Sequence, residues 1–469
     1  MATESYRQFE AGIISPDSIA RDKIKGTTQN SVAFAYNVDF DSIMGYIKGR
    51  KGSIKIGSSI SGVEDIQGIS ALRTFTSNIP VVATSNGSNS NMYYWNGSAW
   101  TASTGWTSKG LGKHRFAQLR GSIFVVNGVN DMMSSTNGAS WVTTNCPTSL
   151  VLSYITRYRG RIIAMTTSGT VYFSSIINPA VSPFITWTTA TNFFIVNPDD
   201  GGYASGFATV GNVLLIFKNN GFYRADITNE FVVPDDLYQV GAISQEAITV
   251  AQGLCYFYSG TSIYKTDGAA YPVDIGRTIQ NYLDSISNKS DVYMSSNEHF
   301  VYLEVGNIVI NGLTYSNVVF RYSIRSDSWT IYGYPYRVKH IFYNDKDNKI
   351  YAGSVNNIYE IEGNYVNDNN TAIPYEVLFQ ELDGGMRGMT KSINNNLAIY
   401  TKYANGSSIG LENDEGKKEE AYVVSEHRVA RPFNLQGNWF NVKWSGIIGS
   451  KLPIFEGIDV FYDNKGIRK

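Results

Sequence analysis

The sequence predicts an all-β protein whose main part is a β-propeller of about seven blades, with six as the alternative count. A turn rich in asparagine, serine and glycine recurs along most of the chain at steps of 39 to 52 residues. An apolar strand precedes most of these turns, and an aromatic strand often follows. A four-stranded propeller blade has about this length, so each turn predicts one blade.

Residues 213–224 show one such unit most clearly. Val213–Phe217 form a purely apolar run, which Lys218 and an Asn219-Asn220-Gly221 turn separate from Phe222 and Tyr223. Asn-Gly supplies the positive φ angles of a tight hairpin, and branched and aromatic side chains suit a buried pleated surface. A meander or a sandwich also places glycine-rich turns at such intervals and is the alternative. The seven turns begin at Asn86-Gly87, Asn127-Gly128, Ser168-Gly169, Asn220-Gly221, Ser259-Gly260, Asn311-Gly312 and Asn356-Asn357.

The same pattern divides the chain into three parts. Residues 1–66 are irregular and predict an N-terminal extended or β segment, whereas residues 67–365 hold the repeats. The polar run 364–371 is typical of a linker. Residues 372–469 contain longer strands and predict a separate C-terminal β-sandwich-like domain.

Charge and cysteine content narrow the classes of function. The formal net charge is −1, which argues against tight nonspecific binding of nucleic acid but does not exclude a neutral conduit for DNA. Cys146 and Cys255 match no metal spacing, and Cys255 lies in an apolar run that predicts a buried free thiol. We expect no signal peptide and no membrane span, because no stretch approaches 18 apolar residues.

One short segment concentrates positive charge. Lys48, Arg50, Lys51 and Lys55 lie within residues 48–55, which contain no acidic residue. Contact with phosphate or with an acidic partner is the functional interpretation. A solvated hairpin is the structural alternative.

No pattern in the sequence predicts catalysis. The four histidines form no metal motif, and no phosphate-binding loop, nucleophile elbow or dinucleotide fingerprint is present. The turns at Asp199-Asp200 and Asp345-x-Asp347 lack the ligand series of a calcium loop and are better explained as hairpin ends. Residues 134–141 resemble the Asp-box of sialidase-type propellers, but Thr136 stands in place of the aspartate. We therefore expect no enzyme activity, no cofactor and no metal.

Several sequence segments together resemble the tail nozzle proteins of bacteriophages, also called packaged-DNA stabilisation proteins of short-tailed phages. These segments are residues 31–40 with 45–52, residues 169–174 with Asn178-Pro179 and Trp187, residues 199–201 with 214–223, and the last segment, 453–462. The resemblance spans nearly the whole chain, although each motif alone is mostly a strand and a turn.

The resemblance implies a structural virion protein, made in the host cytoplasm and assembled into the phage tail. Such proteins form a ring, six-fold in characterised members, below the portal and adaptor rings. Genomic DNA passes through the lumen, and fibres or spikes dock outside. We expect residues 1–66 and 372–469 to build the ring and lumen. The alternative is a carbohydrate-binding or carbohydrate-cleaving propeller that acts as a receptor-binding tail protein, because tyrosine and tryptophan are abundant. An intracellular scaffold of the WD-repeat kind is less well supported, because the Gly-His and Trp-Asp pairs of such repeats are absent.

Overall fold

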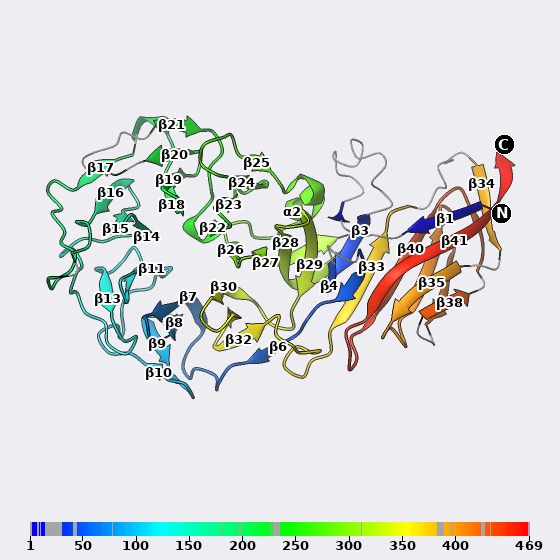
Figure 1. The fold of residues 1–469 in the computed structure, drawn as a ribbon, viewed down its shortest axis with the longest axis horizontal. Helices are drawn as coiled ribbons and strands as arrows, with labels where there is room; N and C mark the ends of the chain where they lie inside the picture. Colours follow the sequence, from blue (N-terminus) through cyan, green and yellow to red (C-terminus); the bar gives the residue numbers. More distant parts are fainter. Residues whose placement is uncertain are drawn as a thin grey trace.

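The computed structural model describes residues 2–467 except 7–8, 10, 15–30, 41–44, 77, 179, 197, 226, 228–234, 311, 382–388, 395–396, 424–426 and 432. Figure 1 shows two all-β parts side by side along the long axis: a disc of radially arranged sheets, and a smaller domain that holds both chain ends.

The disc is a β-propeller, and the described residues form seven blades. Blade 1 contains β7 (Asp65–Arg73), β8 (Asn78–Ser85), β9 (Ser90–Trp95) and β10 (Trp100–Ala102), and blade 2 contains β11 (Arg115–Leu119), β12 (Ser122–Val126) and β13 (Met133–Ser135). Blade 3 contains β14 (Tyr154–Tyr158), β15 (Arg161–Met165), β16 (Thr170–Phe173) and β17 (Phe193–Ile195). Blade 4 contains β18 (Ala204–Val210), β19 (Val213–Lys218), β20 (Phe222–Ala225) and β21 (Asp235–Tyr238). Blade 5 contains β22 (Ile248–Ala251), β23 (Leu254–Tyr258), β24 (Ile263–Thr266) and β25 (Val273–Asp274). Blade 6 contains β26 (Tyr293–Ser296), β27 (Phe300–Ile310), β28 (Leu313–Ser323) and β29 (Ser328–Gly333). Blade 7 contains β30 (Lys339–Asn344), β31 (Lys349–Ser354), β32 (Asn357–Ile361) and β6 (Ser53–Lys55). The short helices between strands are η2 (Pro198–Asp200), η3 (Gln245–Ala247), η4 (Arg277–Ile279) and α2 (Gln280–Asp284).

The blade strands are apolar on both faces because each blade packs between two others. In β19, Leu214 and Ile216 belong to the cluster shared with blade 3, whereas Leu215 and Phe217 belong to the cluster shared with blade 5. The innermost strands contact one another in chain order from β7 to β30, and β30 contacts β7. The ring is therefore closed, and the predicted fold class is confirmed.

The recurring turns mark the blades correctly. Each of the seven lies where the second strand of a blade connects to the third, as Asn86-Gly87 does between β8 and β9, and Asn357 is already the first residue of β32. Asn311 itself lies outside the described residues. The recurring turn, Asn-Gly in four of the seven cases, therefore located the same hairpin in every blade.

The ring is closed by a strand from the N-terminal segment. β6 pairs with β32, with Ser53 opposite Ile361 and Lys55 opposite Tyr359. The predicted boundary at residue 67 is thus wrong, because β6 and the start of β7 already belong to the propeller. A three-residue strand carries too short a pattern to be recognised before its partner is known.

The C-terminal domain consists of two sheets packed on one core. One sheet contains β38 (His427–Arg431), β35 (Leu397–Lys402), β41 (Ile454–Ile467), β34 (Met389–Asn394) and β39 (Asn434–Gly437), with β1 (Ala2–Tyr6), β4 (Val38–Phe40) and β5 (Ile47–Gly49) from the N-terminal segment. The other sheet contains β33 (Pro374–Phe379), β40 (Phe440–Ile447), β36 (Ser408–Asn413) and β37 (Lys418–Tyr422). Phe455 lies between them, with ring centroids 4.9 Å from Phe379 and 5.2 Å from Trp444.

A shared sheet joins the two domains. β3 (Ser31–Tyr36), which also pairs with β2 (Gly12–Ile13), lies between β29 of blade 6 and β33 of the C-terminal domain. β3 pairs with β29 at one position, Tyr36 opposite Ile331, and with β33 at four, so backbone pairing continues from the propeller into the second domain. One apolar cluster also extends across the junction.

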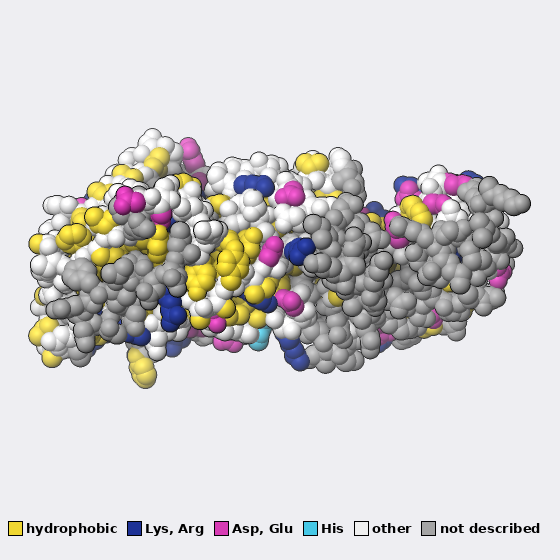
Figure 2. All heavy atoms as spheres, turned by 90° about the horizontal axis from the view of Figure 1, so that it is seen from above, with side chains coloured by type: hydrophobic (Ala, Val, Ile, Leu, Met, Phe, Trp, Pro, Cys, Tyr) yellow, Lys and Arg dark blue, Asp and Glu magenta, His cyan; other side chains and the backbone are white. Residues whose placement is uncertain are grey.

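Two further expectations can be compared with the structure. Cys255 is a buried free thiol, as predicted, and Cys146 is partly buried. None of the helices within the described ranges has the length and apolar character that a bilayer crossing requires. On the face shown in Figure 2, acidic and basic side chains are interspersed, and apolar side chains gather over the propeller.

Candidate functional site

The four basic residues predicted to contact a partner occupy different environments. β5 pairs with β4 and β41, whereas β6 pairs with β32, so residues 47–55 cross between two sheets and form no hairpin. Lys51 is exposed, Lys48 and Lys55 are half-buried, and the side chain of Arg50 is completely buried.

Arg50 is held by the junction between the domains. Its guanidinium forms an ion pair with both carboxylate oxygens of Asp368, one of them at 3.1 Å. It also donates to Asn37 Oδ1 at 2.7 Å and to the carbonyl of Gly333 at 2.6 Å. The ring of Tyr334 stacks on it, with 4.4 Å between Cζ and the ring centroid. Burial lowers the pKa of Arg50, but the nearby Tyr334 and Asp368 raise it by more, so the guanidinium stays charged.

Arg50 is therefore a structural residue, and its predicted contact with an external phosphate or acidic partner is wrong. Its acidic partner is internal and lies 318 positions further along the chain. For Lys48, Lys51 and Lys55, external contact stays a prediction.

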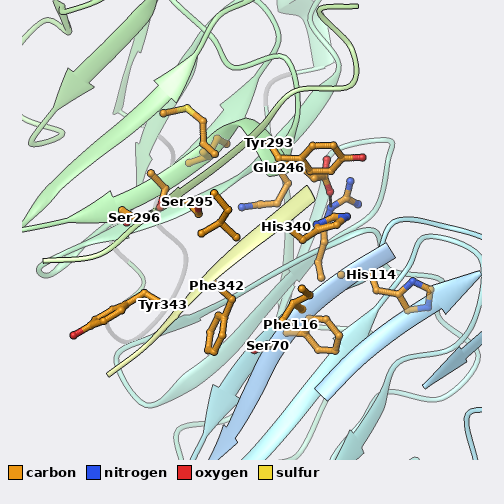
Figure 3. Close-up of a pocket in the computed structure, with 18 of the residues that line it drawn as sticks. Ser70, His114, Phe116, Glu246, Tyr293, Ser295, Ser296, His340, Phe342 and Tyr343 are labelled. Carbon is orange, nitrogen blue, oxygen red and sulfur yellow. Dashed lines mark hydrogen bonds and ion pairs between the residues drawn. The ribbon is translucent and has the colours of Figure 1, made fainter. Parts of the chain in front are cut away.

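A cavity of about 410 Å³ lies at the centre of the propeller, where the inner strands meet (Figure 3). Its lining comes from β7, β11, β14, β22, β26 and β30 and from the η3 turn. In the close-up, Tyr293, Glu246 and His340 lie together, and Ser70, Phe116 and Phe342 form another part of the wall. Such polar and apolar mixtures occur in ligand sites, so the cavity is the first candidate site.

Ion pairs around this cavity run from blade to blade. Glu246 of η3 accepts from Arg115 Nε at 2.6 Å, and Arg115 also donates to the carbonyl of Ser153 at 2.6 Å. Lys339 of β30 lies 3.2 Å from Asp65 of β7. Because these contacts join groups on different blades and compensate their charges, they favour holding the inner strands together over binding a charged substrate.

The histidines near this cavity are neutral at pH 7. Burial lowers the pKa of His340 to about 3 and that of His114 to about 4. The His340 ring meets Tyr293 edge-on, at 4.4 Å between centroids. Ser295 donates to Glu304 and Ser296 to the carbonyl of Val250, so neither serine is paired with a histidine. These described side chains do not form a nucleophile and base pair.

Glu304 makes the propeller sensitive to pH. Its side chain is fully buried, its Oε1 accepts from the backbone of Ile341 at 2.9 Å, and burial raises its pKa to about 7. The folded protein thus holds this proton more tightly than the unfolded chain. Stability from Glu304 is fully present below pH 4.5 and is lost as the pH rises to about 7.

Replacing Glu304 with glutamine tests this dependence. The rise in the pKa of Glu304 from 4.5 to about 7 corresponds to about 3 kcal/mol. Wild type should therefore lose up to about 3 kcal/mol of stability relative to Glu304→Gln between pH 4.5 and pH 7. Urea unfolding of both proteins across this range measures the difference in stability. His114 and His340 are present in both proteins, so their contributions cancel in this difference. A difference independent of pH would contradict the assignment.

The other candidate turns are occupied by internal contacts. The Asp200 carboxylate pairs with Lys218 and accepts from Tyr223 Oη at 2.5 Å. Asp347 accepts from Tyr351 Oη at 2.6 Å. In residues 134–141, Asn137 Oδ1 accepts from two backbone amides and closes a turn. No group of three potential metal ligands occurs among the residues that the structure describes.

Comparison with known proteins gives no family for this chain. No family model and no curated protein matches it. Among solved structures, BamB from Moraxella catarrhalis is 10% identical with a TM-score of 0.44, covering 67% of this chain and 97% of that one. YCF48 from Cyanidioschyzon merolae is 10% identical with a TM-score of 0.42, over 67% and 98%. The WD40 β-propeller domain of Doa1 is 11% identical with a TM-score of 0.42, over 66% and 96%. These likenesses concern the fold alone.

The polar groups of the central cavity had no sequence signal. Glu246, Tyr293 and His340 lie in different blades, and no local motif surrounds any of them. The available clue was the polar start of some innermost strands, such as Lys339-His340 in β30, which contrasts with the apolar second strands.

Proposed function

We propose that this protein is a structural component of a phage tail, forming a nozzle ring below the portal and adaptor that continues and closes the DNA exit channel. The observation that carries the proposal is the joint between the domains. β3 inserts between β29 and β33, so the propeller and the C-terminal domain share one backbone ladder. Two domains that share a sheet transmit force to each other without a flexible linker. A ring around pressurised DNA requires such a rigid connection.

The resemblance of the sequence to tail nozzle proteins supports the same function. In this proposal, the C-terminal domain with β1, β3, β4 and β5 builds the ring, and the propeller lies outside it. Six copies would close through heterologous contacts, in which each copy offers one surface to the next. Fibres or spikes would dock on the outside.

The charge distribution supports passage of DNA. The net charge is −1, and both signs are interspersed on the surface in Figure 2. Since each lysine or arginine contact with phosphate adds affinity, a lumen with few such contacts would let DNA slide. The proposed role contains no catalytic step.

Immunogold electron microscopy of phage particles from the source of this sequence tests the proposal. We expect gold on the tail axis directly below the head, and a reconstruction in which the C-terminal domain lines the channel. Gold only on peripheral fibres would favour the receptor-binding alternative. Absence of label, with a capsid antibody as positive control, would remove the virion assignment. A propeller that lines the channel would overturn the proposed arrangement.

A further inference from the structure

A second cavity lies at the seam where the first and last blades meet. It has a volume of about 680 Å³ and is lined by β8 and β9 of blade 1 and by the β30–β31 turn and β31 of blade 7. Its main lining side chains are Asn78, Pro80, Tyr94, Trp95, Asp347 and Tyr351. This volume is within the range of small-molecule sites. We call this cavity the seam groove.

The aromatic wall of the seam groove is held rigidly. Trp95 is paired across the strands with Trp100, and their ring centroids are 5.2 Å apart. Trp100 Nε1 donates to the carbonyl of Ile56 at 3.1 Å. At Gly57, where φ is +71°, an added Cβ would lie 2.6 Å from the Trp95 ring, so the backbone there packs against the indole. Trp95 is only partly buried and is one of the residues that line the groove.

The polar side of the groove is a fixed carboxylate. Asp347 Oδ2 accepts from Tyr351 Oη at 2.6 Å, and Oδ1 accepts from the backbone of Lys349 at 3.2 Å. Asp347 is nevertheless exposed. Because a carboxylate has about four acceptor positions, further donors from a ligand can bind it.

The chemistry of the groove favours a neutral hydroxylated ligand. No lysine, arginine or histidine lines it, so an anion would find no positive charge among its lining residues. Asp347 is the single acidic residue that lines the groove, and two of its acceptor positions are already taken by Tyr351 Oη and the backbone of Lys349, which disfavours a cation. An aromatic wall beside a hydrogen-bond acceptor matches a sugar ring, which has apolar C–H faces and a rim of hydroxyl donors.

We propose that the seam groove binds a neutral saccharide, with a sugar ring against Trp95 and its hydroxyls donating to Asp347. The site depends on closure of the ring, because Gly57, which packs against Trp95, closely follows β6, the strand that closes the ring. Sugar binding by the seam groove does not depend on where the protein lies in a phage particle. Its test is therefore independent of the test of the nozzle proposal.

The test begins with the full-length protein on an array of neutral, amino and acidic glycans. Titrations monitored by saturation-transfer NMR follow, with lactose, maltose and N,N′-diacetylchitobiose as probes. We expect saturable binding of at least one neutral glycan and at least tenfold weaker binding by Trp95→Ala. Asp347→Ala, in an exposed turn, should weaken binding similarly and serves as the second variant where Trp95→Ala unfolds. Tyr403→Ala alters an exposed aromatic residue of the C-terminal domain and should bind as wild type.

Three results would overturn the proposal. These are no binding of any neutral glycan above background, binding of acidic glycans alone, and binding that survives both Trp95→Ala and Asp347→Ala. Loss of binding in Tyr403→Ala, with the groove variants unaffected, would move the sugar site to the C-terminal domain.

Discussion

Replacing Asp368 with alanine is expected to lower the free energy of unfolding by about 3–5 kcal/mol, because it leaves a buried arginine without its counter-charge. The side chains of Arg50 and Asp368 are 0% and 2% exposed. Water therefore cannot solvate the guanidinium that remains. The substitution also removes the acceptor of the Ser53 hydroxyl at 2.8 Å, in the strand that closes the propeller.

Urea unfolding of Asp368→Ala and of an Arg50→Met, Asp368→Leu double variant measures this effect. The double variant should recover much of the loss, since an apolar pair of similar size removes both charges. Glu456→Ala is the matched control: its ion pair with Lys402 lies at the surface, where solvent screens the charges, and should contribute little to stability. Equal losses in Asp368→Ala and Glu456→Ala would contradict the structural role of Arg50.

Replacing Ala35 with proline is expected to separate the unfolding of the two domains. Ala35 is fully buried in β3, opposite Val377 of β33. Proline removes a backbone donor from the middle of a sheet. The proline ring also disturbs the backbone of β3 between its two neighbouring strands, and we expect a loss of about 1–3 kcal/mol.

Differential scanning calorimetry measures the coupling. Wild type should unfold in one main transition, whereas Ala35→Pro should show two, one for each domain. Ala35→Gly keeps the backbone N–H and should retain one transition at a slightly lower temperature. Two transitions in wild type would show that the shared sheet does not couple the domains.

The propeller could be predicted because its signal is local and repeated. Each blade contributes a second strand with apolar side chains and a turn rich in asparagine, serine and glycine. Both are visible within about twelve residues, as in Val213–Arg224, although φ is positive at none of Asn219, Asn220 and Gly221. The C-terminal sandwich was likewise recognised from its longer strands.

The junction and the cavities could not be predicted, because they depend on residues far apart in the chain. Arg50 and Asp368 are 318 positions apart, and a basic run is equally compatible with solvent exposure. Trp95 and Asp347 meet only because the first and last blades become neighbours. Sequence patterns indicate which face of a strand is buried, but not which distant strand covers it.

Closure of the propeller by β6 has a consequence for synthesis of the chain on the ribosome. The strand that completes blade 7 is made first, whereas its partner β32 begins at Asn357, roughly 300 residues later. At about 5–20 residues per second, the ribosome needs on the order of 15–60 s to reach it. During this interval the partner of Ser53–Lys55 does not exist, so the six earlier blades must form as an open arc. A ribosome-bound chaperone is therefore expected to shield the free edge of the arc, and stalled chains that end before residue 357 should aggregate more readily than those that extend beyond 361.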